Sequence, residues 1–257
     1  MQTVQTGNIL IDLTFPALEF FFQITRNYGW AIIFLTVAVR AALYPLSAKQ
    51  YESMSAMQKI QPRLKEVQSK HSKDPQKMQQ ETLLLYKEHG VNPLGGCLPV
   101  LLQLPIIIAL FATLNNPEVQ GVIRDSGAAG TFFWIKDFAL AEWRQPALIG
   151  LVDKLPLLKF LSPLVLLVGL STYLTQKTMS ANTESSQTKM MAFMPIFMLF
   201  ICANLPTGVL LYWCTSNSLM AAQQYFLSKQ KMVKEKVAVI EVENTSESEK
   251  SENKQGG

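Results

Sequence analysis

An arginine lies deep inside an apolar segment that is long enough to cross a membrane. Residues 28–48 have the length and hydrophobicity of a membrane-spanning helix. At the rise of an α-helix, Arg40 lies roughly 18 Å from Tyr28 and roughly 13 Å from Lys49. A charge at that depth costs on the order of 3 kcal/mol unless it faces protein or water. The fold must therefore give Arg40 a polar environment.

The rest of the chain contains four more apolar segments. Charged residues make up 16% of the chain and hydrophobic residues 49%, whereas soluble domains carry about 25% charged residues. We predict an all-α polytopic membrane protein with a five-helix core at residues 28–227. Its five transmembrane helices are expected at about 28–48, 97–116, 157–176, 190–204 and 207–227.

Three polar or amphipathic segments flank these spans. Residues 1–27 contain an amphipathic, aromatic stretch that is typical of a helix lying on the membrane surface. Residues 49–92 carry eight Lys or Arg, and apolar residues recur at 3-4 spacing on both sides of Asp74-Pro75. This pattern predicts an antiparallel helical hairpin, in which Pro62 should kink the first arm or start a new helix. Residues 228–257 form a polar tail that we expect to be disordered at its end.

The distribution of basic residues predicts the orientation in the membrane. Lys and Arg concentrate in the hairpin and in the tail, and such segments stay on the cytoplasmic side. We therefore expect the hairpin and the C-terminus in the cytoplasm and the N-terminus with its interfacial helix outside. Met1 to Gly7 carry no basic residue, so the start of the chain does not read as a secretory signal.

Polar side chains occur in several of the spans. Thr36, Arg40 and Tyr44 share one face of the first span at helical spacing. Lipid cannot satisfy such groups, so we expect them to converge on one another or on water. A polar cavity open to the cytoplasm and to part of the bilayer, centred on Arg40, would serve this purpose. The other spans contribute Gln103, Ser171, Thr172, Thr175, Gln176, Trp213, Ser216, Asn217 and Gln224.

Two interpretations of Arg40 stay open from the residues alone. It could be a structural residue satisfied by backbone carbonyls or by Gln103, without contact to any substrate. The spans contain no acidic residue, so an ion pair within them is not available, and this favours an arginine that receives an external anion or faces water.

Enzyme chemistry has little support in the sequence. Neither His71 nor His89 lies in a span, and the chain has no nucleophile elbow, zinc-protease motif or phosphate loop. The cysteines Cys97, Cys202 and Cys214 have no metal-ligand spacing. We therefore expect no enzymatic activity, no cofactor and no metal. A small-solute or ion transporter or channel using the same buried arginine remains the alternative function.

Four segments resemble conserved motifs of the YidC insertases, a family related to the mitochondrial oxidase-assembly and chloroplast Albino proteins. Gly29 to Leu46 resembles the family's first conserved span, and Asn92 to Pro105 its most specific motif. Phe133 to Asp137 resembles an external Trp-Ile-x-Asp element. Leu205 to Asn217 resembles the Pro-x-Gly-x-x-x-Tyr-Trp-x-x-Ser-Asn signature of the last span. The resemblance covers residues 16–232 in order.

The resemblance implies an ATP-independent insertase that helps nascent membrane proteins enter the bilayer through a hydrophilic groove. Carried over to this sequence, the groove residues are Arg40, Gln103, Trp213, Asn217 and Gln176. Thr36 and Tyr44 join them as candidates because they share the face of Arg40 on the first span. The apolar part of a client would slide along the second and fourth spans, with candidate contacts at Ile107, Leu110, Met194, Phe197 and Met198.

Partners and location follow from the same resemblance. The hairpin at 49–92 and Lys229 to Lys236 are candidates for contact with the Sec translocon or the ribosome, and no specific nucleic acid is expected. No large external domain or lipoprotein cysteine precedes the first span here, which implies the compact five-span form. A multi-pass protein of the bacterial inner membrane is favoured over a thylakoid protein.

Overall fold

The structure is a computed structural model that describes residues 7–92, 98–145, 160–179 and 197–230. Within these ranges the chain is helical, apart from turns and two isolated β-bridges, Phe132–Ile135 and Ala141–Pro206. The all-α fold class is therefore confirmed. The chain divides into two compact units, Met1–Leu219 and Met220–Gly257. The described part of the second unit, residues 220–230, is helical.

Helix α1 (Ile9–Thr25) packs against α2 (Tyr28–Ala42) and α5 (Leu98–Asn115). Its buried face carries Ile11, Phe15 and Leu18, which are 5%, 0% and 0% exposed. Between the two helices, the Asn27 side chain accepts hydrogen bonds from the first N–H groups of α2 and so caps its N-terminus. A helix lies where the sequence predicted one at the start of the chain, and its position at a membrane surface stays a prediction.

The predicted span at 28–48 is not one straight helix. α2 ends at Ala42, and α3 (Tyr44–Lys70) starts after Leu43 at an angle of 65° to it. Pro45 lies in the first turn of α3, where a proline needs no hydrogen-bond partner. In a continuous helix its ring would collide with the carbonyl of Ala41. The helix therefore does not run unbroken through residue 48, and the span at 28–48 stays a prediction.

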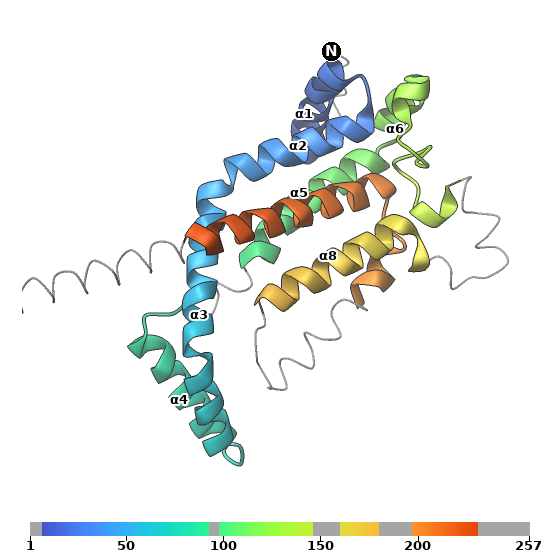
Figure 1. Ribbon diagram of the computed structural model, residues 1–257. Helices are drawn as coiled ribbons and strands as arrows, with labels where there is room; N and C mark the ends of the chain where they lie inside the picture. The colour runs from blue at the N-terminus through green and yellow to red at the C-terminus, as the bar shows by residue number, and fades with distance from the viewer. Residues whose placement is uncertain (1–6, 93–97, 146–159, 180–196, 231–257) are drawn as a thin grey trace, which may run out of the picture. The chain divides into compact units, whose positions relative to one another are not determined.

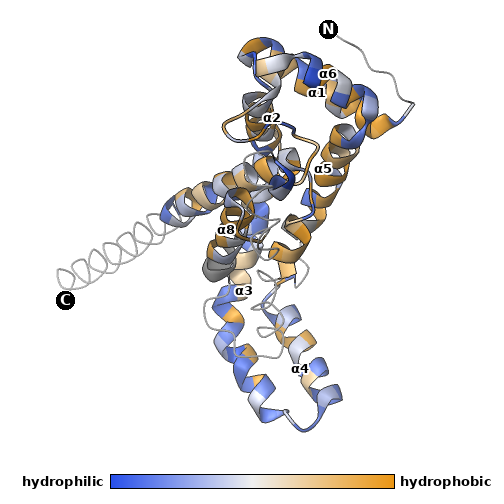
Figure 2. Cartoon of the chain, turned by 90° about the vertical axis from the view of Figure 1, so that its right-hand side faces the viewer, coloured by the Kyte–Doolittle hydropathy of each residue, from blue (hydrophilic) through white to orange (hydrophobic). Residues whose placement is uncertain are grey.

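α3 and α4 (Pro75–Glu88) lie against each other as a hairpin. Asp74 caps α4 by accepting from the Lys77 N–H at 3.1 Å. Buried side chains on α3 include Ile60 and Leu64, at 4% and 9% exposure. Pro62 lies inside α3 and starts no new helix, so of the two predicted effects the kink stays a prediction. Figure 2 shows hydrophilic residues over most of α3 and α4 and hydrophobic residues over α5 and α8.

The remaining described α-helices contribute side chains to the core of the first unit. They are α6 (Pro117–Asp125), α8 (Pro163–Met179), a short helix at 197–202 and a long helix at 207–230. Figure 1 shows α5, α8 and residues 207–219 of the long helix running in similar directions. Gly208 shows how closely the start of the long helix packs against α5, because a Cβ there would lie 2.5 Å from a Leu114 methyl carbon.

The described helices reproduce the predicted spans only in part. α5 covers the predicted span at 97–116, whereas α8 begins at Pro163 rather than near 157, and the last helix continues to 230. Residues 190–196 of the fourth span lie outside the described residues. No single helix described here is both long and apolar enough to cross a bilayer, but two bent pairs could by length and composition: α2 with α3, and Leu101–Asn115 with α6. The count of five spans stays a prediction.

Candidate functional site

Arg40 meets polar side chains from two other helices. It lies in the last turn of α2, where its Nε donates to the Ser216 Oγ at 2.8 Å and its Nη2 donates to the Gln103 Oε1 at 3.1 Å. The Gln103 Nε2 also donates to the Ser216 Oγ, at 3.3 Å. These three residues close a ring of hydrogen bonds that joins α2, α5 and the helix at 207–230. We call them the Arg40 site.

The next residue on the last helix extends the network to α8. The Asn217 Nδ2 donates to the Ser171 Oγ at 3.1 Å and lies 3.3 Å from the Thr172 Oγ1. Asn217 is 6% exposed and Ser216 is fully buried. Polar residues from four helices therefore form hydrogen bonds with one another, as the polar composition of the predicted spans led us to expect.

The Arg40 site carries an uncompensated positive charge. Both of its hydrogen-bond acceptors are neutral, and the ion pair found among the described residues, Arg124–Asp137, lies elsewhere. A guanidinium has five N–H donors. Two of them make the bonds above, and the other three have no hydrogen-bond acceptor in the described part of the chain. The site can therefore still bind an anionic or polar group.

The other predicted groove residues differ in their burial and in their contacts. Thr36 is fully buried, and its hydroxyl donates to the Ile32 carbonyl one turn earlier on α2. Trp213 is half-buried beside the core, whereas Tyr44 is 47% exposed in the first turn of α3. The side chain of Gln176 lies outside the described residues. Ser216 stood among the polar residues of the last span, but nothing in the sequence marked it as the direct partner of Arg40.

The candidate contact residues for an apolar client also differ in how exposed they are. Phe197 is 48% exposed, and Ile107 and Met198 are half-buried. Leu110 is only 2% exposed and belongs to the core, because it lies on the face of α5 that packs inward. Contact between Leu110 and a client therefore stays a prediction that this burial does not support. Met194 lies outside the described residues.

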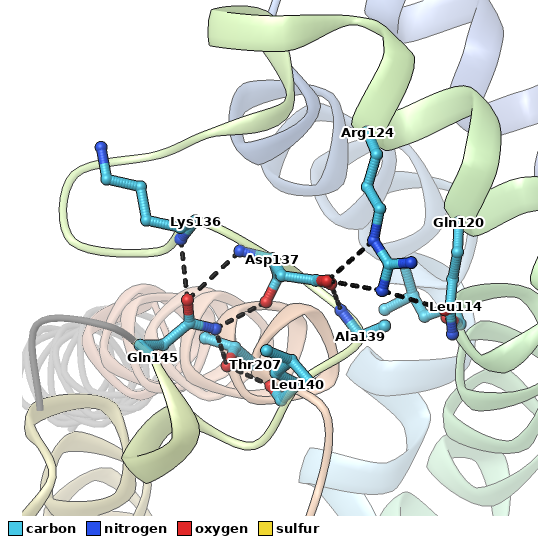
Figure 3. Close-up of polar contacts among 9 residues, drawn as sticks. All are labelled: Leu114, Gln120, Arg124, Lys136, Asp137, Ala139, Leu140, Gln145 and Thr207. Carbon is cyan, nitrogen blue, oxygen red and sulfur yellow. Dashed lines mark hydrogen bonds and ion pairs between the residues drawn. The ribbon is translucent and has the colours of Figure 1, made fainter. Parts of the chain in front are cut away.

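A second polar cluster, which the sequence did not predict, organises residues 126–145. The buried Gln145 side chain accepts from the Lys136 and Asp137 N–H groups at 2.8 and 3.2 Å. It donates to the Asp137 carbonyl at 2.6 Å and to the Thr207 hydroxyl at 3.2 Å. Asp137 in turn pairs with Arg124 at 2.8 Å. Figure 3 shows this cluster fixing the segment to α6 and to the start of the last helix.

Glu142 ties the same segment to α8. Its fully buried carboxylate accepts from the Trp134 Nε1 at 2.8 Å and from the Leu164 and Val165 N–H groups at 3.0 and 3.2 Å. These two backbone groups are unpaired donors of the first turn of α8, so Glu142 caps that helix from a distant part of the chain. Burial raises the pKa of Glu142, and the hydrogen bonds from Leu164, Trp134 and Val165 partly offset this effect.

The described residues contain no group of three or more His, Cys, Asp or Glu side chains that could hold a metal ion.

Comparison with known proteins identifies the family. The family model described as "60Kd inner membrane protein" matches residues 20–235. Relatives named "Membrane protein insertase YidC" from Endomicrobium trichonymphae and Wolinella succinogenes are each 36% identical, over 89% and 91% of this chain. The chain spans 41% and 39% of their lengths.

A solved structure supports the same assignment. It is described as "Active YidC insertase crystal structure with the first transmembrane domain resolved" and matches with a TM-score of 0.63 and 27% identity. The match covers 85% of this chain and 47% of that one. Because the family model covers most of the sequence, this chain is a membrane protein of the 60Kd inner membrane protein family.

Proposed function

We propose that this protein is a membrane protein insertase whose Arg40 site receives a polar or acidic segment of a nascent client. One observation carries the proposal: Arg40 is held by neutral partners from two other helices and keeps three N–H donors without acceptors among the described residues. The relatives named as insertases, at 36% identity over most of this chain, support the same activity.

The mechanism follows from the cost of moving polar groups into a membrane. A client carboxylate near Arg40 gains an interaction that is strong where water is partly excluded. Carboxylates also bind guanidinium groups through short, charge-assisted hydrogen bonds. The apolar part of the client would lie along Ile107, Phe197 and Met198 and enter the lipid, with a gain of about 0.8 kcal/mol for each buried CH₂ group. Burial of the client's apolar part in lipid then drives insertion, and Arg40 lowers the cost of moving the client's polar part into the membrane.

The arrangement in the membrane is part of this proposal. The core crosses the bilayer five times, with the first crossing bent at Leu43, and the groove opens to the cytoplasm and to lipid. The hairpin of α3 and α4 and the C-terminus lie in the cytoplasm of a bacterium and the N-terminus lies outside, because basic residues concentrate in the hairpin and the tail. The hairpin and Lys229 to Lys236 contact the ribosome or the Sec translocon.

Site-specific crosslinking tests whether clients reach the Arg40 site. A photoreactive amino acid at Gln103 or Trp213 should capture a stalled single-span client during synthesis. The matched control is Trp30, which is 47% exposed on the first turns of α2, away from Arg40. Capture at Gln103 and Trp213 but not at Trp30 supports the proposal. No capture at either site position, with solute flux in reconstituted vesicles, would favour a transporter instead.

Charge substitution tests the role of Arg40 itself. Arg40→Lys keeps the charge and should still insert clients that have acidic external segments, whereas Arg40→Glu should insert them poorly. The Arg40→Glu variant should regain insertion of a client whose acidic residues are changed to lysine. Equal insertion by both variants for every client would leave Arg40 with a structural role only.

A further inference from the structure

A pocket at one end of α5 lies outside the Arg40 site. It is lined by Phe111 and Asn115 from the last turns of α5, by the loop at 139–144 and by Asn204 in the turn before the last helix. It contains about 610 Å³ of empty space, part of it open to solvent. None of the residues of the Arg40 site lines it, so it needs an explanation of its own.

The pocket has one charged lining residue, Arg144, and no acidic one. The Arg144 guanidinium stacks on the Trp143 ring, with its central carbon 4.9 Å from the ring centroid. Within the described ranges Arg144 pairs with no carboxylate. A guanidinium held on an aromatic face with its N–H groups available is a typical partner for a phosphate group.

Three neutral lining side chains have unused hydrogen-bonding groups. The Trp143 Nε1 is buried and has no acceptor among the residues that the structure describes. The Asn115 and Asn204 amides donate to the carbonyls of Phe111 and Phe200, one turn earlier in each case. Their side-chain oxygens make no hydrogen bond within the described chain and remain free to accept. The pocket therefore offers donors to a phosphate and acceptors to hydroxyl groups.

An apolar stripe runs along α5 from the edge of this pocket. The side chains of Phe111, Ile108, Leu104 and Leu101 are 41%, 53%, 45% and 57% exposed, and their 3-4 spacing places them on one face of the helix. The stripe is roughly 15 Å long at the helical rise. That length matches about half of a hydrocarbon core roughly 30 Å thick, which is one leaflet.

We propose that this pocket binds the headgroup of an anionic glycerophospholipid whose acyl chains lie along the stripe on α5. Arg144, held on the Trp143 ring, contacts the phosphate, and Asn115 and Asn204 accept from headgroup hydroxyls. A zwitterionic lipid fits less well, because its ammonium group would meet no carboxylate in the lining and Arg144 already covers the Trp143 ring. The proposal does not depend on insertase activity.

Lipid titration of the purified full-length protein in detergent, read by native mass spectrometry, tests the proposal. A phosphatidylglycerol should bind more tightly than a phosphatidylcholine with the same acyl chains. Arg144→Gln should weaken phosphatidylglycerol binding by about tenfold, the usual effect of losing a charge-assisted hydrogen bond, and should change phosphatidylcholine binding by less than about twofold. Trp143→Ala, which removes the aromatic face that holds the Arg144 guanidinium, should weaken phosphatidylglycerol binding by about threefold to fivefold.

Lys136→Gln is the matched control, since Lys136 is an exposed cation of the same segment whose side chain does not line the pocket. It should leave both affinities unchanged. Equal losses for Arg144→Gln and Lys136→Gln would overturn the proposal in favour of general surface electrostatics. Displacement of the lipid by millimolar inorganic phosphate would also overturn it, because the pocket would then be an anion site without lipid specificity. Arg144→Lys, which keeps the charge, should retain the preference for phosphatidylglycerol and so guards against a folding defect.

Discussion

Replacing Gln145 by alanine should destabilise the protein more than any substitution of an exposed glutamine. The Gln145 side chain is fully buried and completes four hydrogen bonds within residues 136–207 (Figure 3). Gln145→Ala leaves the N–H groups of Lys136 and Asp137 and the carbonyl of Asp137 without their partners. Each buried group that loses its partner costs about 1–3 kcal/mol. Since water will enter part of the space, we expect a total near the lower end, about 3 kcal/mol.

Thermal unfolding in detergent, followed by tryptophan fluorescence at a fixed scan rate, measures this effect. For a chain of this size, about 3 kcal/mol corresponds to a decrease in Tm of roughly 6–12 °C. The control is Gln120→Ala. The partly exposed Gln120 side chain donates to the Leu114 carbonyl and accepts from Arg124, so its loss should cost about 1 kcal/mol. Equal Tm shifts for the two variants would refute the reasoning.

Gln145→Glu separates hydrogen bonding from packing because it keeps the shape of the side chain. At neutral pH the new carboxylate still accepts from the Lys136 and Asp137 N–H groups, but its second oxygen faces two acceptors, the Asp137 carbonyl and Thr207. These acceptors raise the pKa of the new carboxyl in the folded state, since only its protonated form can donate. Its stability should therefore recover as the pH falls. A variant that is equally stable at pH 5 and pH 8 would contradict the hydrogen-bond assignment.

Three further substitutions test the packing and the charge of the first unit. Gly208→Ala would place a Cβ 2.5 Å from a methyl carbon of the buried Leu114 and should cost about 1–3 kcal/mol. Gly121→Ala in α6, where a Cβ meets nothing within 4 Å, should be neutral or stabilising by up to about 1 kcal/mol, and comparing their Tm values checks both. Burial raises the pKa of Glu142 above its ordinary value of 4.5, so its contribution to stability is complete below that pH and is lost as the pH rises through the folded-state pKa. Glu142→Gln should flatten this pH dependence of Tm, and an unchanged profile would show that another group is responsible.

The Arg40 site was predictable in its composition but not in its pairing. The sequence showed one buried charge and several polar side chains in apolar segments, and the cost of exposing such groups to lipid predicts that they converge. Gln103 does accept a hydrogen bond from Arg40, and Asn217 donates one to α8. Helical periodicity could not decide that Ser216, rather than Trp213, is the direct partner, because this depends on how the helices are rotated against each other.

The bend after α2 and the cluster around Gln145 were missed for different reasons. Pro45 marked the bend, since proline favours the first turn of a helix and opposes its interior, but apolar residues on both sides suggested one continuous span. The segment at 126–145 has no helical or strand periodicity. Its structure depends on individual contacts such as Glu142 with the first turn of α8 and Gln145 with Thr207, and a single sequence contains no signal for contacts of this kind.

The two interpretations of Arg40 that the sequence left open are compatible in this structure. Its bonds to Gln103 and Ser216 fix the guanidinium between three helices, which is a structural role. Neutral partners satisfy N–H groups but leave the charge itself uncompensated, and a charge in a region of low dielectric gains most from an opposite charge. A residue serving packing alone could be replaced by a neutral amide without that cost. The arrangement therefore favours an Arg40 that is positioned by its helical neighbours and neutralised only when an anionic group arrives.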